Sequence, residues 1–331
     1  MNIIPTLSII IPVYNIENYI QDCLDCVVPQ LSSNTELILV NDGSTDRSSQ
    51  ICSELAINNE YVTYLTKSNG GVSSARNYGL RNAKGLYILF IDGDDTIYPK
   101  SISRILDKIE VTDADAITNS EFIRNYRNIN IITKLKKDRY INKIEKSEGY
   151  DAYENLLKSN FFIPSMWNLI CKKDLYIKYN IKFDERLINN EDVLCAMQLL
   201  LMSRNISILR EPHYKYRLNR PNSATKQFNL RRIESSELYI KKFIKISDNI
   251  THKNLKKELF EYLGYQYLIL IGSLYLTDIS TILLKRDSIK NLDWLVGRVG
   301  LKYSIPYSLF GFEKSGKILS KYIKYRIKEK V

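Results

Sequence analysis

The sequence predicts an α/β protein with a mostly parallel sheet and helices on both of its faces, followed by a C-terminal helical region. Two observations predict this fold. Short β-rich apolar runs alternate with segments of helical spacing through the first 100 residues, and this alternation is typical of a doubly wound sheet. From residue 228 onward the pattern is helical, so the last third is expected to be built from helices.

The alternating elements follow one another closely. Residues 7–13, "LSIIIPV", are a continuous apolar run, typical of a strand that is covered on both faces. Helical spacing over 16–31 ends near Pro29. Further expected elements are strands at 35–42, 61–66 and 86–92 and helices at 44–58, with Ser44 as the N-cap, and at 72–83.

After residue 115 the pattern is looser. Residues 116–141 alternate charged and apolar side chains, which predicts a partly exposed hairpin. Glu191 and Asp192 open an apolar helix at 191–203, and acidic residues suit a helix N-terminus. The other elements expected here are a helix at 149–159 and strands at 205–209 and 213–218.

The net charge of +11 is unevenly distributed along the 331 residues. Residues 1–225 hold 27 Lys and Arg against 27 Asp and Glu, whereas residues 226–331 hold 21 against 10. This asymmetry predicts a domain over 1–225 and a basic helical region over 226–331. A basic region of this kind suggests an anionic partner.

Cysteine usage and hydropathy indicate the compartment. Five cysteines without a repeated framework favour reduced thiols in the cytoplasm. The start of the chain lacks a basic region before its apolar run, so no secretory signal is expected. The apolar stretch at 262–276 is shorter than the roughly 20 residues that a membrane span needs. We therefore expect a cytoplasmic protein, soluble or peripheral at the inner face of the cell membrane.

Polar side chains gather after each predicted strand. In parallel sheets ligands bind beyond the carboxyl ends of the strands, so one mouth is expected there. The residues concerned are Tyr14 and Asn15, Asn41 and Asp42, Asn69 to Gly71, and Asp92 to Asp95.

Asp92 and Asp94 are separated by one residue, Gly93, which makes an irregular turn easy. Two carboxylates facing one cavity can hold Mg²⁺ or Mn²⁺, which prefer oxygen ligands. A diphosphate and waters would complete the coordination sphere. The alternative is an aspartate-rich helix N-terminus without a metal.

Three other groups have a ligand interpretation and a structural one. Asp42 can bind a base or a ribose, or build an Asx turn with Gly43. The backbone N–H groups of Gly70 and Gly71 can cradle a phosphate ahead of a helix. Arg76 can reach a phosphate or be a solvated helix charge.

The stretches "PVYN", "VNDGST", "NGGVSSARNYG" and "FIDGDD", in this order and spacing, resemble the inverting family-2 glycosyltransferases of the GT-A fold. Bacterial capsule and surface-polysaccharide enzymes are the most similar group. The resemblance is tight over residues 6–120 and continues less strictly to about 225. It implies a nucleotide-sugar-binding half at 1–120 and an acceptor half at 121–225.

The resemblance also implies a donor site and a metal site. The donor would be a nucleotide sugar, with uridine diphosphate as the family's commonest carrier. Asp94 would coordinate Mn²⁺ or Mg²⁺ in a DXD motif, while Asp92 would support the metal or bind ribose. The implied nucleotide-sugar contacts are Pro12, Val13, Tyr14, Glu17, Asp42, Asn69, Gly70, Arg76, Asp92 and Gly93.

On the acceptor side the family's acidic pair matches Glu191 and Asp192. Asp192 would be the general base, since inversion needs a carboxylate that takes the acceptor's proton while the donor bond breaks on the opposite face. Helix capping is the alternative for Asp192. Residues with a possible acceptor or diphosphate contact are Asp95, Trp167, Glu191 and Arg217.

Two aromatic positions in this half have competing interpretations. Trp167 can offer its face to a sugar ring or belong to the core. His213 can supply a metal ligand or be structural. The segment from Tyr216 to Ser223 matches a family loop that would close over the diphosphate, with Arg217 as the best candidate contact.

The last helix, "KSGKILSKYIKYRIKEK", is basic and amphipathic. Ile318, Leu319, Tyr322, Ile323 and Ile327 share one face, which suits an anionic membrane surface, where a lipid-linked saccharide acceptor would be found. The alternative is packing on its own domain.

Two other function classes fit less well. A sugar-nucleotide nucleotidyltransferase would need a glycine-rich loop after the first strand, and "PVYNIENY" has no glycine. A nucleic-acid-binding protein would need basic surface at its site, which the zero net charge of residues 1–225 argues against. We therefore expect a metal-dependent inverting glycosyltransferase.

Overall fold

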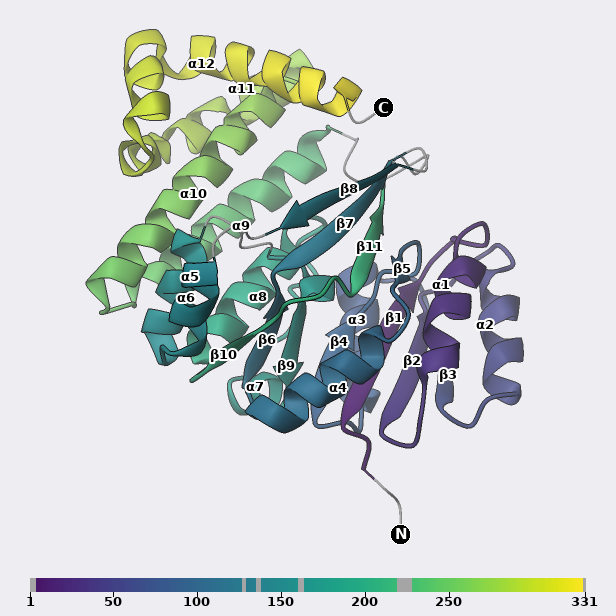
Figure 1. The fold of residues 1–331 in the computed structure, drawn as a ribbon. Coiled ribbons are helices and arrows are strands. Elements are labelled where there is room, and N and C mark those ends of the chain that lie inside the picture. Colours follow the sequence, from purple (N-terminus) through teal and green to yellow (C-terminus); the bar gives the residue numbers. More distant parts are fainter. Residues whose placement is uncertain (1–3, 127–128, 135–137, 160–163, 219–227, 330–331) are drawn as a thin grey trace. The chain divides into compact units, whose positions relative to one another are not determined.

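The computed structural model describes residues 4–126, 129–134, 138–159, 164–218 and 228–329 (Figure 1). The chain divides into two compact units. The first comprises Met1–Glu185 and Glu191–Leu218, and the second comprises Arg186–Asn190 and Asn219–Val331. The domain boundary expected at 225 lies outside the described residues, so it stays a prediction.

The first unit contains a seven-stranded, mostly parallel sheet. β1 pairs in parallel with β2 and with β4, while β9 is antiparallel to β4 and β6. The strands are, in spatial order, β10 (Ile206–Leu209), β6 (Ala116–Asn119), β9 (Leu169–Lys172), β4 (Tyr87–Phe90), β1 (Leu7–Val13), β2 (Thr35–Asn41) and β3 (Val62–Thr66).

Helices cover both faces of this sheet, as the sequence predicts. Successive side chains of a strand point to opposite faces. Ile9 and Ile11 of β1 share a buried cluster with Ile20 of α1 (Ile20–Val27). Ile10, on the other face, lies against Gly79 of α3 (Val72–Asn82). The sheet is therefore buried on both sides, which explains the uninterrupted apolar run of β1.

The first unit also contains a smaller, four-stranded sheet. Its hairpin, β7–β8, is antiparallel as expected for 116–141, and β11 pairs in parallel with β7 and antiparallel with β5. The spatial order is β5 (Thr96–Ile97), β11 (Tyr214–Arg217), β7 (Glu121–Tyr126) and β8 (Ile129–Lys134).

One expected helix start is wrong. Residue Ser44 does not cap the second helix, because α2 (Ser48–Ile57) begins after Arg47. The Ser44 hydroxyl instead accepts the backbone N–H of Asn15, and the Ser48 hydroxyl accepts that of Ile16. These side chains fix the loop after β1. The other helices of the unit are α4 (Ser101–Thr112), α5 (Asp138–Glu145), α6 (Gly149–Lys158), α7 (Lys173–Lys178) and α8 (Glu191–Met202).

The second unit is helical in the part that the structure describes. Asn229, His252 and Asp278 each cap a helix by accepting a backbone N–H with their side chains. The helices are α9 (Leu230–Asp248), α10 (Lys253–Leu274), α11 (Ile279–Lys290) and α12 (Leu301–Glu329). None of the described helices is both long and apolar enough to cross a bilayer.

The last helix, α12, is interrupted at Gly311, whose φ of 70° lies in the left-handed region that favours glycine. Beyond this break the helix packs on α10. A Cβ built on Gly272 of α10 would lie 2.7 Å from Ile323 and 2.9 Å from Leu319. These two apolar residues, expected on a membrane-facing side, therefore face α10 instead, whereas Ile318 is 52% exposed.

Candidate active site

The acidic turn after β4 is held from two directions. The backbone N–H of Asp95 donates to the carbonyl of Asp92 at 3.0 Å, which closes the turn. The backbone N–H of Asp92 donates to the hydroxyl of Tyr214 at 3.2 Å. Gly93 lies so close to the core that an added Cβ would sit 2.6 Å from Ile16. The turn needs glycine here, so Gly93 shapes the site through its backbone.

Arg76 connects this turn to the start of α8. Its Nη2 donates to Asp92 Oδ1 at 2.8 Å, and its Nη1 donates to Glu191 Oε1 at 2.9 Å. The guanidinium is buried and lies 5.4 Å from the ring centroid of Phe183. The solvated interpretation of Arg76 is therefore wrong, and its ion pair with Glu191 joins residues that are 115 positions apart in the sequence.

Asp192 follows Glu191 in the first turn of α8. Burial and the neighbouring charge of Glu191 raise the pKa of the Asp192 carboxyl to about 7, against the lowering effect of Arg76. One carboxylate oxygen accepts the backbone N–H of Val193 at 2.8 Å. A carboxyl with a pKa close to neutral can accept a proton and release it again. This is the property that a general base needs.

Asp95 has a different environment from Asp92. It is 1% exposed, and it accepts the Tyr214 hydroxyl at 2.6 Å and the Arg217 backbone N–H at 2.7 Å. Burial, followed by the charges of Asp94 and Asp92, raises the pKa of Asp95 well above its usual value. Its placement favours a structural role over the acceptor or diphosphate contact that the sequence suggests.

Trp167 also lies inside the unit. Its ring stacks on that of Tyr214 with centroids 4.4 Å apart, and only 7% of the residue is exposed. His213 is buried as well: its Nε2 donates to the carbonyl of Trp167 at 2.9 Å, and burial lowers its pKa to about 4. The core interpretation of Trp167 and the structural interpretation of His213 are the ones that this packing favours.

Arg217 borders the turn from β11. Its Nε donates to the carbonyl of Asp94 at 2.9 Å, and its Nη2 pairs with Asp22 at 2.8 Å. The guanidinium also lies 5.4 Å from the ring centroid of Tyr19. The loop expected to close over the diphosphate runs on to Ser223, and its residues beyond 218 lie outside the described part.

Asp42 follows β2, and its side chain contacts the glycine-rich loop that precedes α3. Its carboxylate accepts the backbone N–H of Gly70 at 3.0 Å and that of Gly71 at 2.7 Å, and pairs with Lys67 at 2.7 Å. Asn69 donates its amide to the Asp42 carbonyl at 3.0 Å. The backbone N–H groups of Gly70 and Gly71, expected to cradle a phosphate, thus donate to the carboxylate of Asp42. Asp42 makes this longer-range contact in place of an Asx turn with Gly43.

The loop after β1 completes the predicted nucleotide side. Tyr14 is 49% exposed, so its ring is available to a ligand. Glu17 accepts the backbone N–H of Arg47 at 3.0 Å, which ties this loop to the start of α2. Pro12 and Val13 pair with Val40 and Asn41 of β2 at the carboxyl end of the sheet. The four predicted residues therefore lie at the carboxyl end of β1 or in the loop that follows it, and the carbonyl of Val13 accepts the backbone N–H of Asp42 at 2.9 Å.

The carboxylates after β4 suit a hard divalent cation by their chemistry. Asp92 has a side chain that is 29% exposed, and Asp94 is partly exposed. Both offer oxygen atoms, the ligands that Mg²⁺ and Mn²⁺ prefer. After burial, the charges of Asp94 and Asp92 contribute to the raised pKa of Asp95, so the carboxylates of this turn repel one another. A bound cation would offset that repulsion, so the residues fit the metal that the sequence predicts.

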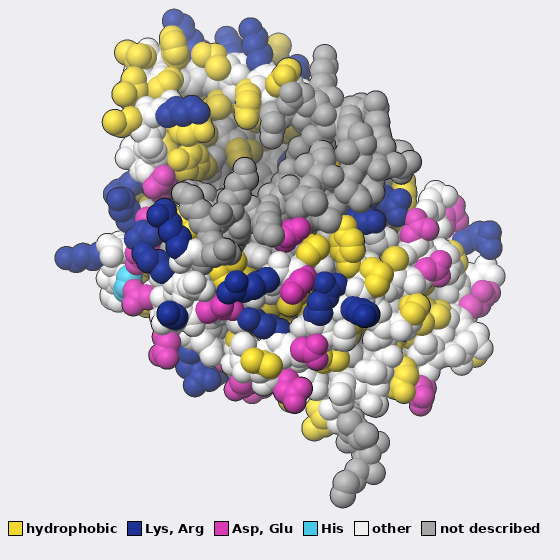
Figure 2. Space-filling view, in the orientation of Figure 1, with side chains coloured by type: hydrophobic (Ala, Val, Ile, Leu, Met, Phe, Trp, Pro, Cys, Tyr) yellow, Lys and Arg dark blue, Asp and Glu magenta, His cyan; other side chains and the backbone are white. Residues whose placement is uncertain are grey.

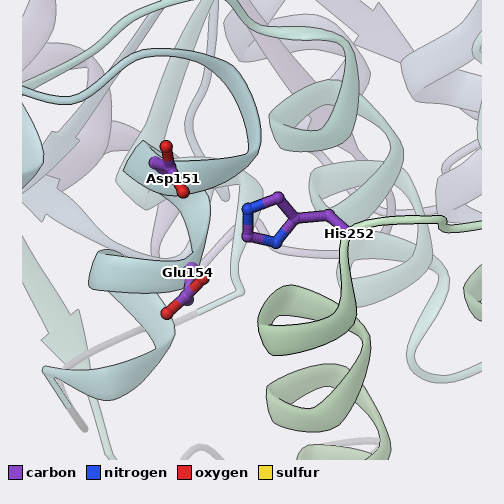
Figure 3. Close-up of side chains that lie close together, drawn as sticks. All are labelled: Asp151, Glu154 and His252. Carbon is purple, nitrogen blue, oxygen red and sulfur yellow. The ribbon is translucent and has the colours of Figure 1, made fainter.

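Another acidic group lies on α6. Figure 3 shows Asp151 and Glu154 on this helix of the first unit, and His252 ahead of α10. Asp151 is exposed, while Glu154 is 7% exposed and pairs with Lys158. His252, in the second unit, accepts the backbone N–H of Leu255 at 3.2 Å. Glu154 and His252 thus each have a local structural role.

Comparison with known proteins places this arrangement among its relatives. Residues 8–174, half of the chain, match the family model described as glycosyl transferase family 2. The "Uncharacterized glycosyltransferase EpsJ" of Bacillus subtilis (strain 168) is 34% identical over 67% of this chain and 63% of its own length. The "Minor teichoic acid biosynthesis protein GgaB" of the same organism is 31% identical over 66% of this chain and 24% of its own length.

A solved structure has a similar fold. The crystal structure of S. aureus TarS 1-349 in complex with UDP-GlcNAc superposes with a TM-score of 0.67 at 19% sequence identity. The alignment covers 96% of this chain and 92% of that one. The likeness supports the GT-A fold with its C-terminal helical region. The chain spans less than two thirds of the length of the two curated relatives above.

Proposed function

We propose, since the chain belongs to glycosyl transferase family 2, that it transfers a sugar with inversion from a nucleotide sugar to a saccharide or lipid-linked saccharide in bacterial surface-polysaccharide synthesis. The observation that carries the proposal is the Arg76 bridge. It joins Asp92, the carboxylate proposed for the donor side, to Glu191, the neighbour of the proposed base Asp192. Inverting transfer needs a base on the acceptor side, opposite the donor bond that breaks, and this bridge supports such an arrangement.

Each residue has a defined task in the proposed reaction. Asp192, with its pKa near neutrality, takes the proton of the acceptor hydroxyl as that oxygen attacks the sugar carbon. Glu191 and Asp92 are fixed by Arg76, which keeps their charges from repelling Asp192 further. Asp94, with Asp92, would hold Mn²⁺ or Mg²⁺, which when bound neutralises the charge of the departing diphosphate.

The donor is proposed to be a uridine diphosphate sugar. The TarS structure with a similar fold was obtained with UDP-GlcNAc, and the loops after β1 and β2 would receive the nucleotide. Tyr14 offers an exposed ring after β1, and the carboxylate of Asp42, after β2, is fixed by the amides of Gly70 and Gly71. The basic helices of the second unit are proposed to contact an anionic membrane surface, where a lipid-linked acceptor would be presented.

Thermal melting with nucleotides tests the donor site. The protein is melted with UDP, GDP, CDP and dTDP, each with and without Mn²⁺. A ligand at 100 times its dissociation constant adds about 2.7 kcal/mol, so UDP with Mn²⁺ should raise the melting temperature by several degrees. Asp94→Asn should abolish the Mn²⁺-dependent part, whereas Asp174→Asn, at an exposed position of α7, should not. If no nucleotide changes the melting temperature, the proposed assignment of the donor site is wrong.

Slow hydrolysis of the donor tests inversion without knowledge of the acceptor. Water in place of the acceptor should release the β-anomer first from a UDP-α-sugar, as read by proton NMR before mutarotation. Release of the α-anomer would contradict an inverting mechanism with Asp192 as base.

A further inference from the structure

The first part of α12, residues 301–310, exposes its large apolar side chains. Leu301, Ile305 and Leu309 are 74%, 52% and 75% exposed, and Phe310 is 48% exposed. Residues four apart lie on the same side of a helix, so the first three form one outward stripe. The less exposed residues of this segment are Ser304 and Tyr307. Its leucines and Ile305 therefore point outward, whereas an ordinary surface helix turns such residues toward the core.

The part of α12 beyond Gly311 also has exposed apolar side chains. Its inward side includes Leu319 and Ile323, which face α10, and the buried residues Phe312, Ser315, Gly316 and Ser320. Gly316 approaches the ring of Tyr275 so closely that an added Cβ would lie 2.3 Å away. The helix thus already packs on its own unit through its inward side. Three apolar residues on its outward side do not belong to that packing: Ile318, Tyr322 and Tyr325, which are 52%, 58% and 59% exposed.

Basic side chains accompany the exposed apolar ones. From Leu301 to Tyr325 the sequence has five lysines against a single acidic residue, Glu313, and Lys302, Lys317, Lys321 and Lys324 are exposed. Figure 2 shows hydrophobic and basic side chains side by side over the region of α11 and α12. A second copy of so basic a face would be repelled by like charges, whereas an anionic surface would be attracted.

We propose that this outward face of α12, comprising Leu301, Ile305, Leu309 and Phe310 with the flanking lysines, docks on an anionic lipid bilayer. The apolar stripe would enter the boundary between headgroups and acyl chains, and the lysines would contact lipid phosphates. Exposed tyrosines along the helix suit the same headgroup level. The inference rests on the proposed function, because a lipid-linked acceptor would be presented at that surface.

Co-sedimentation of the full chain with vesicles tests the docking face. Vesicles of phosphatidylcholine and phosphatidylglycerol at 3:1 are compared with vesicles of phosphatidylcholine alone. The protein should bind the anionic vesicles, and Leu301→Gln with Leu309→Gln should weaken binding at least about tenfold. The matched control is Ile57→Gln with Val111→Gln, two residues of the first unit that are 82% and 81% exposed, and it should bind as the wild type does.

The charged part of the face has its own variant. Neutralising Lys317, Lys321 and Lys324 to glutamine should weaken binding about fivefold per lysine, and 0.5 M salt should weaken it in the unmodified protein. Absence of binding to anionic vesicles, or equal binding by the leucine variant, would overturn the proposal. So would a dimer in sedimentation velocity that the leucine variant dissociates, because a second copy would then cover the face.

Nucleotide binding separates this inference from the proposed function. The leucine and lysine variants should keep the UDP-dependent shift of the melting temperature, since the altered residues belong to the second unit. Loss of vesicle binding with an unchanged UDP shift supports the docking face. A UDP shift without any vesicle binding by the wild type overturns the docking face and leaves the donor site supported.

Discussion

Replacing Arg76 with methionine should remove the cation that holds two acidic groups of the site together. The Arg76 side chain is 7% exposed, and its partners Glu191 and Asp92 are 10% and 29% exposed. Removing one partner of a buried ion pair costs about 3–5 kcal/mol, because a buried charge loses its counterion. At about 2–4 °C per kcal/mol for a domain of this size, the melting temperature should fall by roughly 6–20 °C.

The two-pronged geometry of Arg76 makes lysine an informative second variant. Lysine keeps the charge but presents it on one nitrogen, which cannot reproduce the fork that reaches both Glu191 Oε1 and Asp92 Oδ1. Arg76→Lys should therefore lose one charge-assisted hydrogen bond, a cost of about 1.5–3 kcal/mol. Arg81→Met is the matched control, since Arg81 is an exposed arginine of the same helix and its loss should change stability by less than about 0.5 kcal/mol.

Activity provides a readout that stability alone does not. Arg76 lowers the pKa of Asp192, so its replacement by methionine should move the acid limb of the pH–rate profile to higher pH. The assay is donor hydrolysis or transfer measured from pH 5 to 9 at a temperature well below the melting point of the variant. Equal melting temperatures for Arg76→Met and the wild type, or an unmoved acid limb, would refute the bridging role.

Two further predictions concern the neighbours of this bridge. The wild-type kcat/KM should rise with pH through an apparent pKa of about 7, the pKa of Asp192. The Asp192→Asn variant should have a lower activity that no longer rises with pH in this range. The folded-state pKa of Asp192 lies above the unfolded value of 3.8, so the wild type should lose stability as the pH rises from about 4 to 7. In urea unfolding, the free energy of unfolding of Asp192→Asn should therefore rise relative to that of the wild type between pH 4 and 8. Tyr214→Phe should cost about 1–3 kcal/mol in the same measurement, since Asp95 would lose a buried hydrogen-bond donor; a change as small as that of the partly exposed Tyr216→Phe would contradict this.

Much of the fold follows from local pattern. The strand at Leu7–Val13 and the helix at Val72–Asn82 agree with the predicted positions to within a residue, because burial on both faces of a strand and on one face of a helix leaves a clear periodicity. The antiparallel insertion of β9 (Leu169–Lys172) between β4 and β6 has no such local mark. Its register, with Ile88 opposite Cys171, depends on pairing across more than 80 residues of sequence.

The ion pairs of the site could not be predicted from local pattern either, because Arg76 and Glu191 are also far apart in the sequence. The helix containing Arg76 did offer a signal, since Arg76 is three residues from Ser73 and from Gly79, and all three are buried. An arginine on the small-residue side of a helix that faces a sheet must find buried acidic partners. Such reasoning predicts that partners exist. It does not tell which carboxylates they are, because Glu191 belongs to a segment that the fold alone brings near.

The cluster of three carboxylates after β4 shows how the fold separates like charges that the sequence places together. Asp92 is paired with the guanidinium of Arg76, and Asp95 is buried against the Tyr214 hydroxyl and the Arg217 amide. Asp94 remains partly exposed, and its carbonyl positions Arg217. Three carboxylates that are close in sequence thus have three different environments, so a substitution at Asp95 should act through packing, whereas one at Asp94 should act through the proposed cation.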